Sequence, residues 1–339
     1  MASNRDSAIS LPSLNTFSTP RTDFSRPSDA AMDTGTIKGK TALVLDGATG
    51  LGLGIATALS EHATKVAICG SDAKAGETVA NDLNGRGYCV SFFSTDTGDW
   101  NSLLSTFKQV ITWSDEQLDI VVTTAGIVTH NLLMSALPSN HRAGADPPKP
   151  PTRTLEVNLM GVYYTTSLAI WYFNQLNCKR LDPEFRPQLV FICSMAGYDG
   201  LEFGTDYAAS KHAVRAIWKT TRNPRPSMAQ YQSNLLAPTY VSKKKIAGEC
   251  ERKLRDHNTQ TNDIADVVAG ALRCICDKTV EGRAVCCVQG STGTPGSLNF
   301  DLCDDLIGSN GGRELLDRAE DIWLPSSATL KEDSDCAVQ

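Results

Sequence analysis

The chain has 339 residues, of which 41% are hydrophobic and 21% are charged, and its formal net charge is −6. This balance is typical of a globular protein with a hydrophobic core, and the acidic surplus argues against nucleic acid as a partner. No run of about 18 apolar residues occurs and the N-terminus lacks the apolar segment of a secretory signal, so we expect a cytoplasmic protein without a membrane partner.

Three segments of different composition predict the domain organisation. Residues 1–36 are rich in Ser, Thr, Asp and Pro and contain few large apolar residues, so we expect a disordered N-terminal extension. Residues 37–325 carry alternating apolar strands and helices and are expected to form a single domain. Residues 326–339 are expected to form a flexible C-terminal tail.

Short apolar strands alternate with helices along this domain. We expect strands at 40–45, 65–69, 89–93, 118–123, 188–193, 233–237 and 283–288. We expect helices at 53–62, 73–84, 101–113, 153–176, 207–222 and 263–276. This spacing is typical of βαβ units, whose strands are parallel and covered on both faces. The predicted fold class is therefore α/β, a doubly wound parallel seven-stranded sheet of the Rossmann type.

Eleven cysteines are scattered between Cys69 and Cys336. No CxxC pair occurs, and no His/Cys cluster has the spacing of zinc ligands, so we expect no metal site. We interpret the cysteines as small buried hydrophobic residues of a protein in a reducing compartment.

A glycine-rich turn follows the first strand and reads Leu45-Asp46-Gly47-Ala48-Thr49-Gly50-Leu51-Gly52-Leu53-Gly54. Glycines between a strand and a helix let the backbone approach a pyrophosphate, which then lies at the positive N-terminus of the helix. Any tight strand-to-helix turn also uses glycine. The position of this turn at the first βα junction favours a dinucleotide site.

Tyr207 and Lys211 form a Y-x-x-x-K motif on a predicted helix. A spacing of four residues places both side chains on one helix face, where they can reach the same ligand. A free phenol loses its proton only at about pH 10, and a lysine cation one turn away favours the phenolate. Alone, the motif also fits an exposed helix pair that arises by chance. Ser194 precedes Tyr207 by 13 residues and lies at the end of the strand predicted at 188–193. Asn158 lies on the helix predicted at 153–176, which precedes that strand.

The order and spacing of these motifs resemble the short-chain dehydrogenase/reductase family over about residues 37–292. The family fingerprint T-G-x-x-x-G-x-G registers on Gly50 and Gly52, with Leu45 and Asp46 in the places of the threonine and the first glycine. Thr239, where the family usually has glycine after proline, resembles fungal members similar to 15-hydroxyprostaglandin and hydroxyaverantin dehydrogenases.

The resemblance implies four catalytic residues. Tyr207 would exchange a proton with the substrate oxygen, and Lys211 would favour its phenolate and contact the nicotinamide ribose. Ser194 would orient and polarise the carbonyl or alcohol. Asn158 would hold a water that links Lys211 to solvent.

The resemblance also implies an NAD or NADP cofactor, with NAD slightly favoured. The family's NAD-selecting acid would fall on Gly70, and Asp72 could replace it or simply cap the next helix. Asp96 matches the aspartate that contacts adenine in the family. The expected cofactor-binding residues are Gly47, Thr49, Gly50, Leu51, Gly52, Ser71, Asp72, Asp96, Thr97, Ala125, Gly126, Tyr207, Lys211, Pro238, Tyr240 and Val241.

We therefore expect an NAD(P)-dependent oxidoreductase that interconverts a small-molecule secondary alcohol and its ketone, in fungal secondary metabolism. One alternative is a degenerate family member with isomerase or cyclase chemistry, since Asp46 and Thr123-Thr124 depart from the family pattern. Another is a nucleotide-binding regulatory protein, against which the intact Ser194, Tyr207 and Lys211 argue. The helices of Asn158 and Tyr207 normally form the family's dimer interface, which leaves a homodimer or homotetramer open.

Overall fold

The computed structural model describes residues 32–62, 64–128, 149–176, 182, 184–199, 204–222, 229–239, 241, 262–288, 295–296, 299–302 and 304. One compact unit spans Pro20–Leu302, and every strand and helix named below lies in it. A second unit, Met1–Thr19 with Cys303–Gln339, lies almost entirely outside the described residues. The same holds for residues 326–339 of the predicted tail, and the domain boundary near 325 stays a prediction.

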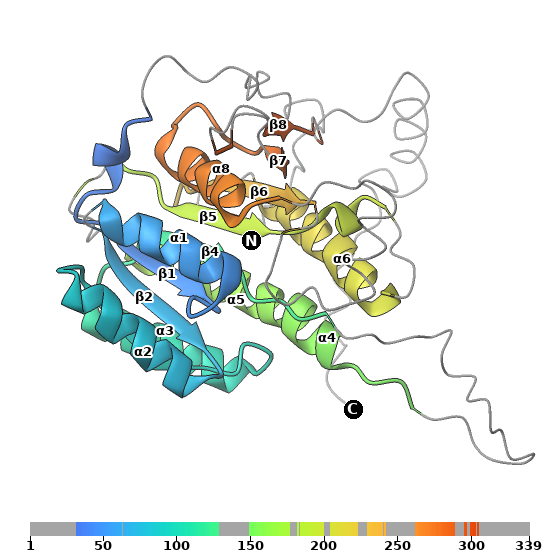
Figure 1. Ribbon diagram of the computed structural model, residues 1–339, viewed down its shortest axis with the longest axis horizontal. Coiled ribbons are helices and arrows are strands. Elements are labelled where there is room, and N and C mark those ends of the chain that lie inside the picture. Colours follow the sequence, from blue (N-terminus) through green and yellow to red (C-terminus); the bar gives the residue numbers. More distant parts are fainter. Residues whose placement is uncertain are drawn as a thin grey trace, which may run out of the picture. The chain divides into compact units, whose positions relative to one another are not determined.

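A sheet of eight strands in the order β3-β2-β1-β4-β5-β6-β7-β8 forms the middle layer of this unit (Figure 1). Neighbouring strands are parallel from β3 to β7, and β8 is antiparallel to β7. The strands are β1 Thr41–Leu45, β2 Lys65–Gly70, β3 Val90–Ser94, β4 Ile120–Thr123, β5 Gln188–Ile192, β6 Gln232–Pro238, β7 Ala284–Cys287 and β8 Phe300–Asp301. The predicted parallel seven-stranded sheet is confirmed, and β8 extends it.

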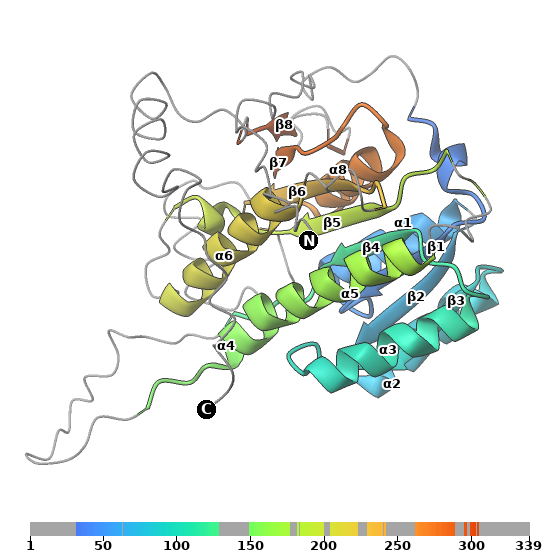
Figure 2. The same ribbon diagram turned by 180° about the vertical axis from the view of Figure 1, so that it is seen from behind.

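Helices cover both faces of the sheet. One face carries α1 Gly50–Glu61, α2 Ala73–Gly85 and α8 Ile264–Cys276. The other face, in front in Figure 2, carries α3 Trp100–Trp113, α5 Gly161–Gln175 and α6 Thr205–Thr221. The short α4, Arg153–Leu155, leads through a π-turn, η3 Glu156–Met160, into α5. The arrangement is doubly wound, because the chain crosses to the other face where the strand order reverses between β1 and β4.

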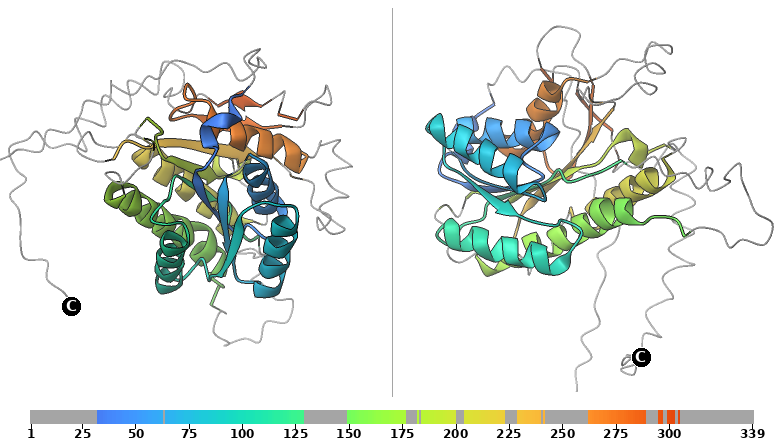
Figure 3. Two further views of the ribbon diagram at one scale, coloured as in Figure 1. Left: turned by 90° about the vertical axis from the view of Figure 1, so that its left-hand side faces the viewer. Right: turned by 60° about the horizontal axis from the view of Figure 1, so that its bottom comes forward.

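The sheet lies between two layers of helices (Figure 3). Each of the strands β1 to β7 contributes to two hydrophobic cores, one on each side of the sheet. In β1, Ala42 and Val44 pack beneath α1 and α8, whereas Leu43 and Leu45 pack beneath α3 and α5. Alternate residues of a strand point to opposite faces, so a strand buried on both sides reads as a continuous apolar run. That is why the strands were predictable.

The described residues begin at Met32, before the predicted domain start at residue 37. Thr34–Ile37 form a 3-10 turn, η2, whose N-cap Asp33 accepts a hydrogen bond from the backbone N–H of Gly35. Ile37 is fully buried in the core beneath α8. Residues 34–36 of the predicted extension are therefore ordered, because the turn is capped and leads into this anchor. Residues 1–31 lie outside the described part of the chain.

Seven cysteines are described, all as free thiols, and six of them are buried. Burial raises the pKa of the Cys69 thiol to about 12 and that of Cys286 to about 11. These thiols behave as small core residues, as the sequence predicts. Within the described residues, no three His, Cys, Asp or Glu side chains gather as a metal site would require. None of the helices described is both long and apolar enough to cross a membrane.

Candidate active site

The predicted site residues lie at one edge of the sheet, where the parallel strands have their carboxyl ends. Ligands of doubly wound proteins bind in the crevice at this edge. The predicted residues follow or end successive strands: Gly47 to Gly52 after β1, Ser71 and Asp72 after β2, Asp96 and Thr97 after β3, Ala125 and Gly126 after β4, Ser194 after β5, and Pro238 at the end of β6. Val241 lies just beyond and forms a bridge with Asn262. Tyr240 lies outside the described residues.

The glycine-rich turn is tightly packed. A Cβ atom on Gly47 would lie 2.6 Å from Cγ2 of Ile68, and one on Gly52 would lie 2.2 Å from the carbonyl oxygen of Asp46. Gly50 has a φ of 53°, which favours glycine. Glycine is therefore required at these positions of the turn, which leads directly into the N-terminus of α1, where a pyrophosphate would bind.

Asp46 also has positive φ, at 50°. This left-handed conformation explains why the family has glycine at this position, and aspartate tolerates it better than most residues. A Cβ atom on Gly70 would lie 3.5 Å from Oδ1 of Asp46, so the carboxylate lies beside the end of β2. The substitution thus preserves the backbone of the turn and adds a negative charge next to the expected adenosine site.

Thr124 anchors the turn to the neighbouring strand. Its hydroxyl donates a hydrogen bond to the carbonyl oxygen of Leu45, the last residue of β1. The Thr123-Thr124 pair departs from the family's usual residues, but Thr124 fixes the ends of β1 and β4 relative to each other. Sequence reasoning assigned it no role.

Asp72 is the N-cap of α2. Its Oδ1 accepts a hydrogen bond of 3.0 Å from the backbone N–H of Ala75, which satisfies one of the unpaired donors of the helix start. Asp72 therefore acts as a helix cap, which is one of the two roles that the sequence left open. Both Asp72 and Ser71 are exposed.

Lys211 is almost completely buried, with 4% exposure, although it is a lysine. Its Nζ donates a hydrogen bond of 3.0 Å to the carbonyl oxygen of Ile192 and lies 5.6 Å from the ring centre of Tyr207. Tyr207 is partly exposed, one turn earlier on α6. The two side chains of the predicted pair therefore lie close together, with the ammonium group of Lys211 beside the ring of Tyr207.

The loop that carries Ser194 packs directly on α6. The Oγ of Ser194 accepts a hydrogen bond of 3.2 Å from the N–H of Ala196, which caps the short turn η5 Met195–Gly197. A Cβ atom on Gly197 would lie 2.9 Å from the carbonyl oxygen of Lys211. This close backbone approach holds Ser194 at a fixed position relative to the Tyr207 helix.

Asn158 is fully buried in the π-turn η3. Its amide makes two hydrogen bonds of 2.8 Å with the backbone of Ile127, and its Nδ2 lies 3.3 Å from Oγ of Ser210. A Cβ atom on Gly126 would lie 3.6 Å from Nζ of Lys211 and 3.7 Å from Oδ1 of Asn158. Asn158 therefore holds the loop after β4 against Lys211, and its predicted role in binding a water stays a prediction.

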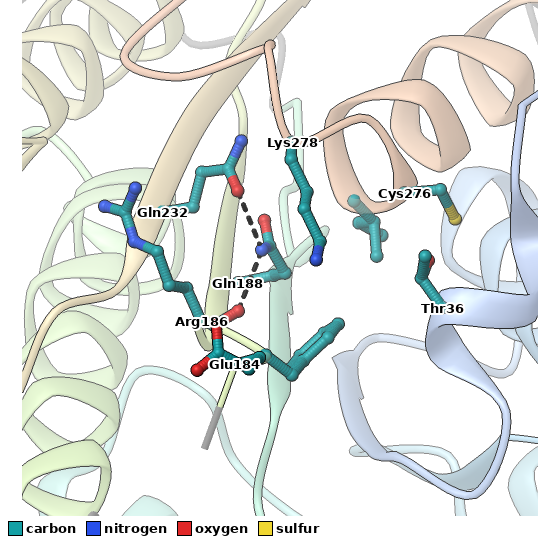
Figure 4. Close-up of a pocket in the computed structure, with 9 residues that line it drawn as sticks. Thr36, Glu184, Arg186, Gln188, Gln232, Cys276 and Lys278 are labelled. Carbon is teal, nitrogen blue, oxygen red and sulfur yellow. Dashed lines mark hydrogen bonds between the residues drawn. The ribbon is translucent and has the colours of Figure 1, made fainter. Parts of the chain in front are cut away.

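A small cavity lies at the amino ends of the strands, opposite the candidate active site (Figure 4). It has a volume of about 60 Å³, and Gln188 and Gln232, the first residues of β5 and β6, contribute to its wall. Nε2 of Gln188 donates a 3.1 Å hydrogen bond to Oε1 of Gln232. Its size and its position at the amino ends of the strands exclude this cavity as the dinucleotide site.

Comparison with known proteins agrees with this geometry. Residues 40–250 match the family model described as short chain dehydrogenase. The chain is 42% identical over 297 residues to the NADP-dependent dehydrogenase M3 of Phoma sp., covering 85% of this chain and 86% of that protein. It is 41% identical over 263 residues to the NADP-dependent dehydrogenase clz5 of Cochliobolus lunatus, covering 75% and 90%.

A more distant relative is the 5'-hydroxyaverantin dehydrogenase of Dothistroma septosporum, which is 30% identical over 84% of this chain and 93% of its own length. Among solved structures, a short-chain type dehydrogenase/reductase from Mycobacterium ulcerans superposes with a TM-score of 0.62, covering 75% of this chain and 90% of that one. At 18% identity, that likeness establishes the fold alone.

Proposed function

This chain belongs to the short-chain dehydrogenase family, and on that premise we propose that it interconverts a secondary alcohol and a ketone by hydride transfer with a nicotinamide dinucleotide. The observation that carries the proposal is the buried Lys211 beside the Tyr207 ring, on a helix that also fixes the Ser194 loop. A lysine is rarely buried without a chemical or structural reason. Nucleotide binding alone would not require a buried lysine beside a tyrosine ring.

The residues of the site fit a dinucleotide. The turn after β1 would hold the pyrophosphate with its backbone N–H groups at the start of α1, since Gly47 and Gly52 leave no room for side chains. Gly126, beside Lys211 and Asn158, places no side chain at the end of β4, where the nicotinamide ring would lie. When bound, the nicotinamide supplies or accepts the hydride.

In the proposed mechanism a side chain of the protein transfers the proton to or from the substrate oxygen. In the reducing direction the Tyr207 hydroxyl donates its proton to the carbonyl oxygen as the hydride reaches the carbon, and in the oxidising direction the phenolate takes it back. The cation of Lys211 stabilises the phenolate. The Ser194 hydroxyl donates a hydrogen bond to the substrate oxygen and so stabilises the charge that develops there.

We propose NADP in preference to NAD as the cofactor. The slight preference for NAD depended on Asp72, and that carboxylate is engaged as the N-cap of α2. Two relatives above 40% identity carry NADP-dependent in their names. At the end of β2, Gly70 and the exposed Ser71 carry no carboxylate that would repel a 2′-phosphate.

The substrate class proposed is a polyketide-like aromatic alcohol or ketone of fungal secondary metabolism. Two relatives, at 30% and 29% identity, are named 5'-hydroxyaverantin dehydrogenases. The sequence places loops around 130–152, 196–206 and 239–260 at the substrate, and much of these three ranges lies outside the described residues. The test is turnover: the purified protein should oxidise NADPH in the presence of an aryl ketone, and the isomerase alternative gains support if substrate is converted while NADPH is not.

We also propose that the protein forms a homo-oligomer through α5. Tyr163 and Trp171 lie on one face of this helix with 56% and 62% exposure, and large aromatic residues at that exposure mark an interaction surface. Trp171→Glu is expected to convert the oligomer to a monomer in light scattering after gel filtration, without loss of thermal stability. Lys74→Glu, on the exposed surface of α2, should leave the oligomer intact. A monomeric wild-type protein would refute this interface.

A further inference from the structure

Asp96 is held in place by its own loop. The loop follows β3, and Oδ1 of Asp96 accepts a hydrogen bond of 2.9 Å from the backbone N–H of Gly98. The backbone N–H of Asp96 donates a hydrogen bond of 2.9 Å to Oγ of Ser102, in the first turn of α3. Both the backbone and the carboxylate of Asp96 therefore have a defined orientation.

Arg153 joins this carboxylate to the helix that carries Asn158. Its Nη2 donates to Oδ1 of Asp96 at 2.7 Å, and its Nη1 lies 3.4 Å from Oε2 of Glu156, the first residue of the π-turn. The hydroxyl of Thr152 donates to Oε1 of the same glutamate at 2.7 Å. The hydrogen bond from Arg153 holds the pKa of the Asp96 carboxyl below its ordinary value, so this group is charged at neutral pH.

The two segments also meet backbone to backbone. A Cβ atom on Gly98 would lie 3.0 Å from Nη1 of Arg153 and 3.3 Å from the carbonyl oxygen of Glu156. A Cβ atom on Gly161 would lie 2.4 Å from the carbonyl oxygen of Thr97. The loop at 96–98 therefore rests directly on residues 153–161, and the ion pair bridges two segments that already touch.

The ion pair itself adds little to stability. The side chains of Arg153 and Asp96 are 48% and 45% exposed, and exposed pairs contribute about 0–1 kcal/mol. A variant without the pair should therefore fold normally. Any large effect on ligand binding would then come from the position of the carboxylate.

The position of Asp96 indicates what the carboxylate meets. With the pyrophosphate at the start of α1, a dinucleotide extends its adenosine half across the ends of β2 and β3. Among the described residues, the two hydrogen-bond partners of the Asp96 carboxylate, Gly98 and Arg153, both contact Oδ1. A carboxylate has about four acceptor sites, so Oδ2 is available to a donor such as the exocyclic amine of adenine.

We propose that Arg153 is a positioning residue for the cofactor, which acts through Asp96 to fix the acceptor for the adenine amine. This inference rests on the proposed function, because it needs a dinucleotide in the site. Arg153 occupies Oδ1 and so presents Oδ2 to the ligand. Through Glu156 it also ties the adenine end of the site to the π-turn that holds Asn158.

The test compares ligands that contain or lack adenosine. Arg153→Ala should raise the Kd about tenfold for whichever of NADPH and NADH the wild-type protein binds more tightly. The Kd of ADP-ribose, measured by calorimetry, should rise by a similar factor. Reduced nicotinamide mononucleotide, which lacks the adenosine half, should bind both proteins equally. Arg153→Lys should recover part of the affinity, because it keeps a cation beside Asp96.

Arg86→Ala is the matched control, since Arg86 forms an exposed ion pair of 3.1 Å with Glu61 outside the site. It should change none of these affinities. A dinucleotide Kd within twofold of wild type in Arg153→Ala would overturn the inference and leave the proposed function standing. An equal loss for the mononucleotide and the dinucleotide would overturn it too, by showing a general disturbance of the site. A wild-type protein that binds no dinucleotide would refute the proposed function itself, and the inference with it.

Discussion

Replacement of Tyr207 by Phe is expected to lower kcat by about 10²–10⁴-fold, the usual contribution of a general acid or base. Phenylalanine keeps the ring that lies 5.6 Å from Nζ of Lys211 and removes only the hydroxyl. The ring packing and the hydrogen bond from Lys211 to Ile192 should persist, so the site should remain assembled. The dinucleotide Kd should change by less than about threefold, because the lost group acts on the substrate oxygen.

The loss should appear in kcat, measured with saturating cofactor and substrate. Tyr88→Phe is the matched control, since Tyr88 precedes the amino end of β3, whereas the site lies at the carboxyl ends of the strands. The Tyr88 hydroxyl is 3.5 Å from Nη2 of Arg86. That variant should retain wild-type kcat. If Tyr207→Phe keeps more than half of the wild-type kcat, the acid-base role assigned to Tyr207 is wrong. If it loses dinucleotide binding as well, Tyr207 acts in cofactor binding rather than in proton transfer.

The second large effect concerns stability. Arg283→Ala is expected to lower the free energy of unfolding by about 3–5 kcal/mol, because it removes the guanidinium and its two hydrogen bonds from a buried carboxylate. The side chains of Arg283 and Asp301 are only 1% and 6% exposed, and Nε and Nη2 of the arginine both donate to Oδ2 of Asp301. The pair joins the start of β7 to β8, the last strand of the sheet.

Urea unfolding followed by circular dichroism would measure this loss. The exposed pair of Arg86 and Glu61 provides the comparison, because Arg86→Ala should cost less than about 1 kcal/mol. If Arg283→Ala does not accumulate as folded protein, the double variant Arg283→Met with Asp301→Leu should, since it removes both buried charges together. A loss below 1 kcal/mol in Arg283→Ala would contradict the account of this pair.

The sequence predicted the parts of the fold that carry strong periodic signals. The parallel strands are buried on both faces and appear as apolar runs. Gly47, Gly50 and Gly52 mark the first βα turn, because a Cβ atom at Gly47 or Gly52 would clash and Gly50 has a positive φ. Ser194, Tyr207 and Lys211 were predicted as site residues because their order and spacing along the chain resemble the family motif, and their catalytic roles stay predictions.

Other features leave no local signal. The strand β8 has two residues, too few for any period. The π-turn at Asn158 depends on tertiary contacts with Ile127 and Ser210, which sequence spacing does not reveal. The pair of Arg153 with Asp96 joins residues 57 positions apart. The sequence also left Asp72 open between two roles, and only the hydrogen bond to Ala75 shows that it caps α2.

The measurement that tests the central claim most directly is a titration of the purified protein with NADPH and with NADH, followed by nicotinamide fluorescence. The account predicts that NADPH binds with a Kd on the order of micromolar and that NADH binds more weakly. Such binding would show that the Asp46 carboxylate does not prevent a dinucleotide from occupying the turn. The result that would contradict the account is that neither dinucleotide binds at concentrations on the order of millimolar. The hydride-transfer function is then refuted.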